Sequence, residues 1–399
     1  MPLSAIRRIY RSLPPTYWTI WLGTLVNRIG GFVVPFLALY ITKQRHESEA
    51  AAGIVVSLYG GGTILASLVG GTLTDRLGRR ATMLLSLFGG SVTMLAIGLV
   101  SSLPALGVAT FVMGWVAEMY RPAVAAMITD VVPPADRQRA FGYLYWVINL
   151  GYAIAPALAG LVLHTSYLAL FVVDATTTFV FGLIVLARVP ETRPAEAAEA
   201  AQRGDGPGLC SVLGDGTFMF FVTLTLGVGL VMWQNNVALP IDMARHGISA
   251  TGYGLLVSIN GVMIVFLQPS ITRTVAHRSR TRVLAISCLL LGIGFGMYGL
   301  VGSYAGYAVA IAVWTLGEIA NLPTTSAVVS ELAPTALRGR YQGVSNMSWG
   351  IASFLGPLVG GVFMRGPGGR ALWFSCFALM LLVTLGHVAL GPARRRREI

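Results

Sequence analysis

The chain has 399 residues, of which 55% are hydrophobic and only 11% are charged. Charged residues make up roughly 25% of an average globular domain, so this composition excludes a protein that is soluble along its whole length. The formal net charge of +12 alone is compatible with nucleic-acid binding. However, the basic residues lie mainly in short segments between long apolar stretches, which argues against a nucleic-acid partner.

Twelve apolar stretches predict twelve membrane-spanning helices, because about 20 apolar residues in a helix cross the hydrocarbon core of a bilayer. Backbone polar groups in lipid must be satisfied within the segment, which favours helices. The alternating segments of about ten residues that build a membrane barrel are absent. We therefore predict an all-α membrane protein with spans at residues 17–41, 51–73, 81–101, 105–132, 141–163, 167–189, 216–239, 251–271, 282–302, 305–331, 342–364 and 370–391.

The positions of Lys and Arg predict the orientation of the chain in the membrane. Most of the 28 basic residues precede span one or follow an even-numbered span. Cytoplasmic segments carry an excess of Lys and Arg, so we expect both termini in the cytoplasm. We therefore predict a multi-pass protein of the cell membrane. In a cell that has two membranes, this is the inner membrane.

The two halves of the chain are related by an internal repeat. Residues 118–160 return at 319–361 with a constant offset of 201 residues. Eight matched positions carry the repeat: Pro122, Asp130, Pro133, Arg137, Arg139, Gly142, Pro156 and Gly160 return as Pro323, Glu331, Pro334, Arg338, Arg340, Gly343, Pro357 and Gly361. Parallel repeats of this kind hold a solute near the bilayer midplane in secondary transporters.

The repeat and a change in composition predict the domain organisation. A segment rich in Ala, Glu, Pro and Gly follows span six and forms the expected cytoplasmic linker. We predict two pseudo-symmetric six-helix bundles, at residues 1–190 and 215–399, joined by a linker at 191–214.

Span one contains two polar residues, Asn27 and Arg28, within an apolar stretch. An ionisable residue inside a membrane is energetically costly and is by default a functional candidate. We therefore place both residues in the candidate substrate site. Arg28 needs an acid from a neighbouring helix as a partner.

The cytoplasmic loop between spans two and three reads GTLTDRLGRR at residues 71–80. Glycines permit a tight turn and arginines hold the loop at the inner surface, but acids contribute little to topology. We interpret Asp75 as an acceptor for N–H groups exposed at the start of a neighbouring helix. The span that begins near Gly343 is one candidate.

This decapeptide resembles the loop signature of the major facilitator superfamily, G-x-L-x-D-R-x-G-R-[RK], and twelve spans in a six-plus-six repeat are similar to that family's fold. The resemblance implies that the motif latches the two halves in an outward-facing state through a charge relay among Asp75, Arg79 and Asp130. The corresponding region of the second half, QPSITRTVAHRSR, has lost the acid, so we expect a latch on one side only. The implied gating residues are Gly71, Asp75, Arg76, Gly78, Arg79, Arg80 and Asp130.

Spans four and six add further ionisable residues to the first half. Glu118 and Arg121 are three residues apart on span four, so they share a helix face and can pair. Arg28 then needs Asp174 of span six or Glu118. A structural cluster of ion pairs and a solute site explain these four residues equally well. We keep Glu118 and Asp174 as candidate proton-coupling residues.

Glu318 in span ten differs from these residues, because the second half contains no intramembrane cation to pair with it. Low-dielectric surroundings disfavour the charged form of a carboxyl group. Such a group gains and loses a proton as its surroundings become dry or wet. The alternative is a permanently protonated Glu that is hydrogen-bonded to a facing helix.

The string TLGEIANLP at residues 315–323 resembles the tenth span of the drug:proton antiporter branch of that family. The resemblance implies that Glu318 is the proton-coupling carboxylate. The chain departs from the branch where some relatives carry acids in spans five and seven, since it has Leu144 and Asn235 there. Fewer acids argue against a strongly dicationic substrate.

Polar and aromatic side chains recur in the deeper parts of several spans. Ligand pockets combine apolar and aromatic side chains with a few polar groups, although packing against lipid is the alternative for the tryptophans. We interpret Trp18, Trp21 and Trp373 as interfacial. The candidate substrate-binding residues are Asn27, Arg28, Glu118, Tyr120, Arg121, Tyr145, Trp146, Asn149, Trp233, Gln234, Asn235, Glu318, Asn321, Asn346 and Trp349.

These features together predict a proton-coupled secondary transporter that exports small amphipathic compounds by alternating access. Its expected partners are a small-molecule substrate, protons and the lipid bilayer, and we expect a monomer. The main alternative is a proton-coupled importer or permease in which Arg28 and Arg121 bind an anionic or zwitterionic metabolite. A sensor or a lipid-moving protein is a further alternative.

The sequence offers nothing that predicts an enzyme. The five histidines are scattered, and no phosphate-binding loop is present. No group of His, Cys and acidic residues has the spacing of a metal site. We therefore expect no catalytic residues, no cofactor and no metal.

Overall fold

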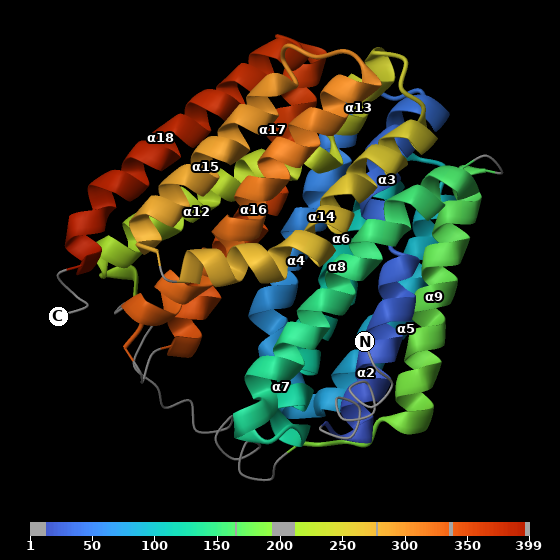
Figure 1. Ribbon diagram of the computed structural model, residues 1–399. Helices are drawn as coiled ribbons and strands as arrows, with labels where there is room; N and C mark the ends of the chain where they lie inside the picture. Colours follow the sequence, from blue (N-terminus) through green and yellow to red (C-terminus); the bar gives the residue numbers. More distant parts are fainter. Residues whose placement is uncertain (1–12, 164–165, 194–211, 277, 335–337, 396–399) are drawn as a thin grey trace. The chain divides into compact units, whose positions relative to one another are not determined.

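The structure is a computed structural model that describes residues 13–163, 166–193, 212–276, 278–334 and 338–395. Within these residues it is helical and contains no β-strand (Figure 1). Twelve helical segments are long and apolar enough to cross a membrane. The predicted all-α membrane fold with twelve spans is therefore confirmed. Residues 194–211 of the predicted linker lie outside the described residues.

Short polar residues start several of the first six spans. Ser102 and Ser166 accept the backbone N–H groups of Ala105 and Ala169, which helix starts leave free. The elements are α2 (Pro15–Ile29), α3 (Val33–Leu39), the π-helix η1 (Tyr40–Gln44), α4 (Glu49–Leu77), α5 (Arg79–Leu99), α6 (Leu103–Glu118), α7 (Tyr120–Val131), the 3₁₀-helix η2 (Pro134–Asp136), α8 (Arg137–Val162) and α9 (Tyr167–Arg188). Spans one and four are each divided between two helices.

The second six spans follow the same rules, with Asp215 and Ser303 accepting N–H groups at the starts of two helices. The elements are α12 (Gly216–Met232), the 3₁₀-helix η3 (Trp233–Asn236), α13 (Ala238–Arg245), α14 (Ala250–Ala276), α15 (Arg280–Met297), α16 (Tyr304–Leu332), α17 (Arg338–Arg365) and α18 (Gly369–Arg395). From the sequence, span seven is predicted to end at residue 239. The helical path instead continues through α13 to Arg245, and this part contains the buried Asp242.

The chain divides into two compact units that do not coincide with the two halves of the sequence. Unit 1 contains Met1–Val33, Gly61–Ala155 and Val162–Asp205. Unit 2 contains Val34–Gly60, Pro156–Leu161 and Gly206–Ile399. Parts of spans one, two and five are thus grouped with the second half. The predicted boundaries at residues 190 and 215 stay a prediction.

Each unit has a core of packed helices. In unit 1, α5 packs against α6 and α9, and α2 packs against α9. In unit 2, α15 packs against α16 and α18, and α12 packs against α17. Glycine is required where α4 meets α17, because a Cβ atom on Gly53 would lie 2.9 Å from Cα of Gly361. Small residues permit such close approach between helices in a membrane.

Candidate functional site

The acid predicted in span ten, Glu318, lies in α16 of unit 2 and binds an amide of α14. Nδ2 of Asn260 donates a hydrogen bond of 2.6 Å to Oε2 of Glu318 and lies 3.1 Å from Oγ1 of the buried Thr315. No salt bridge involves Glu318 within the residues that the structure describes. An amide N–H group donates to a carboxylate and to the carbonyl oxygen of a protonated carboxyl. This partner is therefore compatible with both protonation states of Glu318.

Sequence reasoning missed Asn260. The residue stands in the apolar run GLLVSINGVMIVF of α14. An amide inside an apolar span is a signal in itself, because polar side chains in membranes hydrogen-bond across helices. Since α14 and α16 pack against each other, the amide of one helix reaches the acid of the other. The acid thus has a neutral hydrogen-bond donor as its neighbour.

Asp174, the acid of span six, accepts hydrogen bonds from the backbone of span one where that span is interrupted between α2 and α3. Its Oδ2 accepts the backbone N–H groups of Phe32 and Val33 at 3.0 Å each, and the residue is only 3% exposed. The N–H groups at the start of a helix have no partner within that helix, and these two stand at the start of α3. The carboxylate therefore has a structural task, and its role in proton coupling stays a prediction.

Glu118 and Arg121 form the expected salt bridge at the junction of α6 and α7. The Glu118 side chain is mostly buried, whereas the Arg121 side chain is 62% exposed. The two opposite charges of this pair neutralise each other within span four. Arg121 is thus engaged by an acid of its own span.

The polar residues of α2 make specific contacts with α7 and α9. Oγ1 of Thr24 and Oη of Tyr120 are 2.7 Å apart, and Nδ2 of Asn27 donates to Oγ1 of Thr178 at 2.8 Å. The Nε atom of Arg28 is buried and has no hydrogen-bond acceptor among the described residues. Three predicted site residues, Asn27, Arg28 and Tyr120, are therefore gathered in one part of unit 1.

The predicted residues of span five lie on α8. Trp146 stacks on Trp21, with ring centroids 6.4 Å apart and an interplanar angle of 9°. Nδ2 of the buried Asn149 donates to the carbonyl of Tyr145 at 2.8 Å. The amide of Asn149 is thus bound within its own helix. Trp21, which we predicted to be interfacial, therefore stacks on Trp146, a predicted substrate-binding residue.

Two predicted amides of unit 2 hold neighbouring helices together. Nε2 of Gln234 donates to the carbonyls of Leu230 and Gly356 at 3.0 and 2.9 Å. Nδ2 of Asn321 donates to Oγ of Ser287 at 3.0 Å. Both amides are buried. These contacts give the two residues structural partners, whatever their role in binding.

The remaining predicted residues of unit 2 differ in their surroundings. Oδ1 of Asn235 is buried and accepts no hydrogen bond from the described residues. The ring of Trp233 lies 6.3 Å from that of Tyr59. Asn346 is exposed, and Trp349 is partly buried on the same helix.

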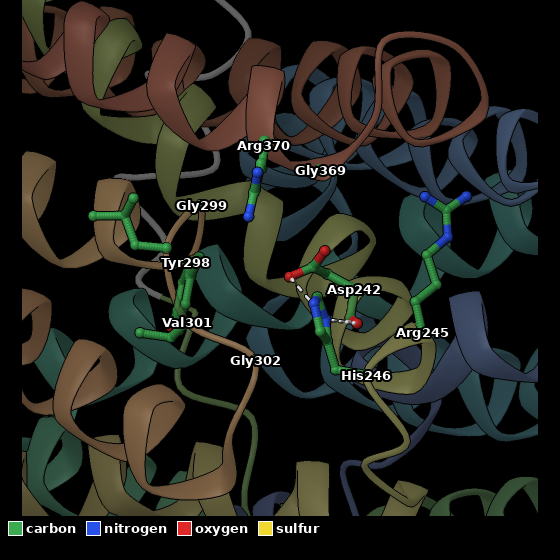
Figure 2. A pocket seen from close by; sticks show the side chains of 10 residues that line it. Asp242, Arg245, His246, Tyr298, Gly299, Val301, Gly302, Gly369 and Arg370 are labelled. Carbon is green, nitrogen blue, oxygen red and sulfur yellow. Dashed lines mark hydrogen bonds and ion pairs between the residues drawn. The ribbon is translucent and has the colours of Figure 1, made fainter.

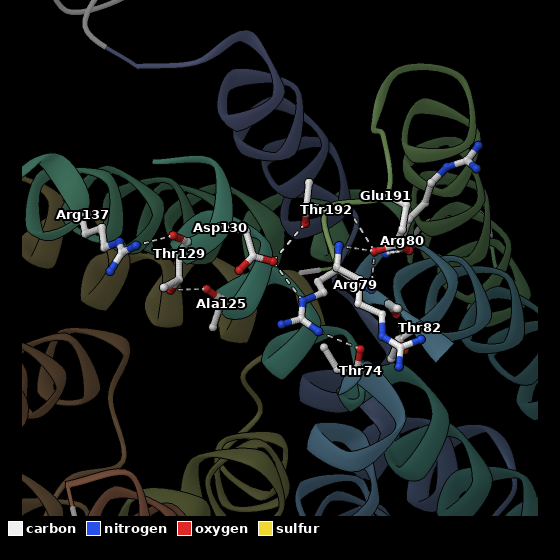
Figure 3. Close-up of polar contacts among 12 residues, drawn as sticks. Thr74, Arg79, Arg80, Thr82, Ala125, Thr129, Asp130, Arg137, Glu191 and Thr192 are labelled. Carbon is white, nitrogen blue, oxygen red and sulfur yellow. Dashed lines mark hydrogen bonds and ion pairs between the residues drawn. The ribbon is translucent and has the colours of Figure 1, made fainter. Parts of the chain in front are cut away.

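Arg79 and Asp130, two of the implied gating residues, contact each other in unit 1. Nε of Arg79 lies 2.9 Å from Oδ2 of Asp130, and the two side chains are 7% and 16% exposed (Figure 3). The same carboxylate oxygen accepts a hydrogen bond of 3.1 Å from Oγ1 of Thr192. The Asp75 side chain lies outside the described part of the structure, so the relay through it stays a prediction.

The other residues of the loop motif build the turn itself. Gly78 has a φ of +102°, which favours glycine, and it immediately precedes α5. A side-chain N–H group of Arg80 donates to a backbone carbonyl of α9 at 2.7 Å, and Arg193 donates to the carbonyl of Arg76 at 2.9 Å. Gly71 has open space where a Cβ atom would be.

Sequence reasoning also missed Glu191, which it assigned only to the linker. The Glu191 carboxylate accepts the backbone N–H groups of Arg79 and Arg80 at 2.9 and 3.1 Å. It also accepts those of Thr192 and Arg193 at 2.9 and 3.0 Å. The start of α5 has no side-chain cap of its own. Glu191 thus accepts the N–H groups at the start of α5, whereas the predicted role of Asp75 at a helix start stays a prediction.

A second polar cluster, which the sequence did not predict, is built on α13, the short helix that follows η3. Asp242, 5% exposed, accepts hydrogen bonds from Oη of Tyr307 at 2.6 Å and Nε1 of Trp373 at 3.2 Å. Nδ1 of His246 lies 4.0 Å from the same carboxylate (Figure 2). The cluster borders a cavity of about 400 Å³. Trp373, predicted as interfacial, is fully buried and helps to join α13, α16 and α18.

Residues from both halves of the sequence meet within unit 2. Nη2 of Arg245 donates to Oε1 of Glu49 at 2.8 Å and to the carbonyl of Met364 at 2.7 Å. Oγ1 of Thr251 donates to the carbonyl of Gly160 at 2.8 Å. We call these contacts the Glu49 seam. Its ion pair between Glu49 and Arg245 lies at the first residue of α4.

The model of the Major Facilitator Superfamily matches residues 20–234 and 219–398. The uncharacterized MFS-type transporter YqjV of Bacillus subtilis is 26% identical, over 98% of this chain and 96% of that protein. A Na(+), Li(+), K(+)/H(+) antiporter of Planococcus maritimus is 26% identical over 82% and 84% of the two chains. Multidrug resistance protein 1 of Bacillus subtilis is 24% identical over 91% and 93%.

Solved structures agree with the fold. A peptide transporter POT in complex with sulfate has a TM-score of 0.80 and 17% identity, over 98% of this chain and 99% of that one. A D-xylose-proton symporter has a TM-score of 0.78 and 16% identity, over 95% and 98%. At such low identity these likenesses show the fold alone.

Proposed function

Since this chain belongs to the major facilitator superfamily, whose members are membrane transporters and not enzymes, we propose that it is a proton-coupled exporter of small amphipathic compounds. The transport cycle is alternating access between the two sides of the membrane. Both termini lie in the cytoplasm, and two bundles at residues 1–190 and 215–399 are joined by the linker. The working unit is a monomer that binds a small-molecule substrate and protons.

The observation that carries this proposal is the hydrogen bond between Asn260 and Glu318. Glu318 has a neutral donor as neighbour and forms no salt bridge among the described residues. Its protonation state is therefore not fixed by a cation, and it changes when access to water changes. A carboxyl group of this kind couples proton movement to a conformational cycle. Proton return through Glu318 drives the substrate out.

The relatives support the direction of transport. One relative is named a multidrug resistance protein and another a cation/proton antiporter. The name of the antiporter describes exchange of cations for protons, and exchange against protons is the mechanism that we propose here. The alternative is a proton-coupled importer for an anionic or zwitterionic metabolite. The unpaired Nε of Arg28 favours that alternative.

Arg79, Asp130 and Glu191 have a gating role in this proposal. The Arg79–Asp130 pair stabilises one conformation of the cycle, and Glu191 holds the start of α5 from which Arg79 extends. Support comes from their hydrogen bonds in unit 1. The Glu49 seam stabilises the conformation described here.

Purified protein in liposomes tests the proposal. A panel of amphipathic dyes and antibiotics is first screened for compounds that raise the melting temperature, since binding to the folded state stabilises it. Flux of the best stabiliser is then measured with a pH gradient imposed in either direction. The proposal expects movement of solute against an opposed proton flow. Flux in the same direction as protons supports the importer, and the absence of pH-driven flux contradicts both.

A further inference from the structure

Arg28 has hydrogen-bond donors that the described protein residues do not satisfy. It lies in the last turn of α2, immediately before the break in span one. Its Nε is buried and has no acceptor among the described residues. Arginine is always charged and has five N–H donors. Leaving such donors unpaired inside a membrane bundle is energetically costly.

The acidic residues of the surrounding helices are engaged elsewhere. Asp174 is close enough to interact electrostatically with Arg28, but its Oδ2 accepts the two backbone N–H groups at the start of α3. Glu118 pairs with Arg121. Asp174 therefore offsets part of the charge of Arg28 at a distance, without accepting its hydrogen bonds.

The neutral neighbours of Arg28 are also bound. The hydroxyl of Tyr120, which interacts electrostatically with Arg28, is 2.7 Å from that of Thr24. The amide of Asn27 donates to Thr178. These contacts leave the guanidinium group as the polar group of this cluster that lacks a protein acceptor among the described residues.

The backbone at Arg28 is held firmly against α8. A Cβ atom on Gly151 would lie 2.3 Å from Cβ of Arg28 and 3.1 Å from its carbonyl carbon, so only glycine permits this contact. The base of the Arg28 side chain is thus fixed between α2 and α8. Because the base of the side chain is already fixed, the guanidinium loses less conformational freedom when it binds a ligand.

We propose that Arg28 binds an anionic group of the transported solute, so that the substrate is an amphipathic anion or zwitterion. Carboxylate, sulfonate and phosphate groups all match the planar guanidinium fork, which binds them through two parallel hydrogen bonds. The inference rests on the proposed function only in that the chain binds a solute. It depends neither on the direction of transport nor on proton coupling.

The test measures binding by purified protein in detergent at one pH, without a gradient. The probes are aromatic carboxylic acids, beginning with 1-naphthylacetic acid, each paired with its methyl ester. The ester keeps the apolar part and lacks the charge. The wild-type protein should bind the acids about 10- to 100-fold more tightly than the esters, as expected for a charge-assisted hydrogen bond in a buried site.

Two substitutions and a control sharpen the test. Arg28→Gln should abolish the preference for the acid and leave ester binding unchanged. Arg28→Lys keeps the charge but not the fork, and should retain a smaller preference. Arg139→Gln, at an exposed arginine that pairs with Asp136, removes the same charge elsewhere and should retain the full preference.

A wild-type protein that binds none of the acids, or binds acids and esters equally, contradicts the inference. A folded Arg28→Gln or Arg28→Lys protein with undiminished preference also contradicts it. Because no proton gradient is used, these results are independent of whether Glu318 couples transport to protons.

Discussion

Glu191 accepts the backbone N–H group of Arg79, a residue 112 positions earlier in the chain. The contact ties the segment after span six to the start of α5, directly beside the Arg79–Asp130 pair (Figure 3). The residues that begin the predicted linker therefore contact the cluster of Arg79 and Asp130 in unit 1, for which we propose a gating role. A movement of the linker would act directly on the position of Arg79.

The first prediction concerns this cap. Glu191→Ala removes the acceptor for the N–H groups at the start of α5, and should lower the free energy of unfolding by about 1 kcal/mol, as loss of a helix cap does. Thermal unfolding in detergent measures the change. Asp136→Ala is the control, because Asp136 pairs with Arg139 on the exposed surface. Equal effects of the two substitutions would show that Glu191 has no special role.

The second prediction concerns the coupling of Arg79 to Asp130. Both side chains are largely buried, so Arg79→Gln and Asp130→Asn should be strongly non-additive. A double-mutant cycle on unfolding should give a coupling of about 1–3 kcal/mol. The exposed pair of Arg139 and Asp136 provides a matched cycle and should give less than about 1 kcal/mol. Additive effects at Arg79 and Asp130 would rule out an energetic link.

The third prediction concerns the Glu49 seam. Glu49→Gln removes the charge that pairs with Arg245, and should make the seam open more often. The labelling rate of a cysteine at the buried Ser57 of α4, in a background without the three native cysteines, should rise about 2- to 5-fold, in line with a partly exposed ion pair.

Glu47→Gln is the control for the seam, because Glu47 is an exposed acid two residues before Glu49. Its substitution should leave the labelling rate at Ser57 unchanged. If both substitutions raise the rate equally, local charge rather than the contact with Arg245 is responsible.

The fourth prediction concerns Asp174, which the sequence left open as a proton-coupling residue. Asp174→Ala leaves the N–H groups of Phe32 and Val33 without an acceptor, which costs about 1–3 kcal/mol for each buried group. Asp174→Asn keeps a carbonyl oxygen and should lose less stability. Proteoliposome assays of the folded Asp174→Asn protein should still show pH-driven transport. If the Asp174→Asn protein has normal stability but no pH-driven transport, Asp174 is a proton-coupling residue rather than a structural one.

The sequence predicted the spans well, because apolar length and the lack of charge depend only on local composition. The salt bridge between Glu118 and Arg121 was equally predictable from the sequence, because residues that are three apart lie on the same face of a helix. That Asp174 binds backbone groups could not be predicted from the sequence, because the break in span one becomes visible only in three dimensions. The sequence alone suggests Arg28 as its charge partner.

Other features depend on contacts between distant segments. Glu191 reaches α5 across more than 100 residues, and nothing near residue 191 in the sequence indicates that. The predicted span seven ends at residue 239, whereas a second short helix, α13, follows the 3₁₀ turn Trp233–Asn236 and extends to Arg245, so Asp242 lies beyond the predicted end. Asn260 was overlooked because a single amide carries no charge.

The central claim is that Glu318 exchanges a proton when solute binds. The most direct test is to count protons released by purified protein in weakly buffered detergent solution, using a pH-sensitive dye, when the best stabilising solute is added near neutral pH. The wild-type protein should release protons in proportion to solute bound. Glu318→Gln should bind the solute and release none. Equal release by both proteins, or solute binding without release by the wild type at any pH, would contradict the account.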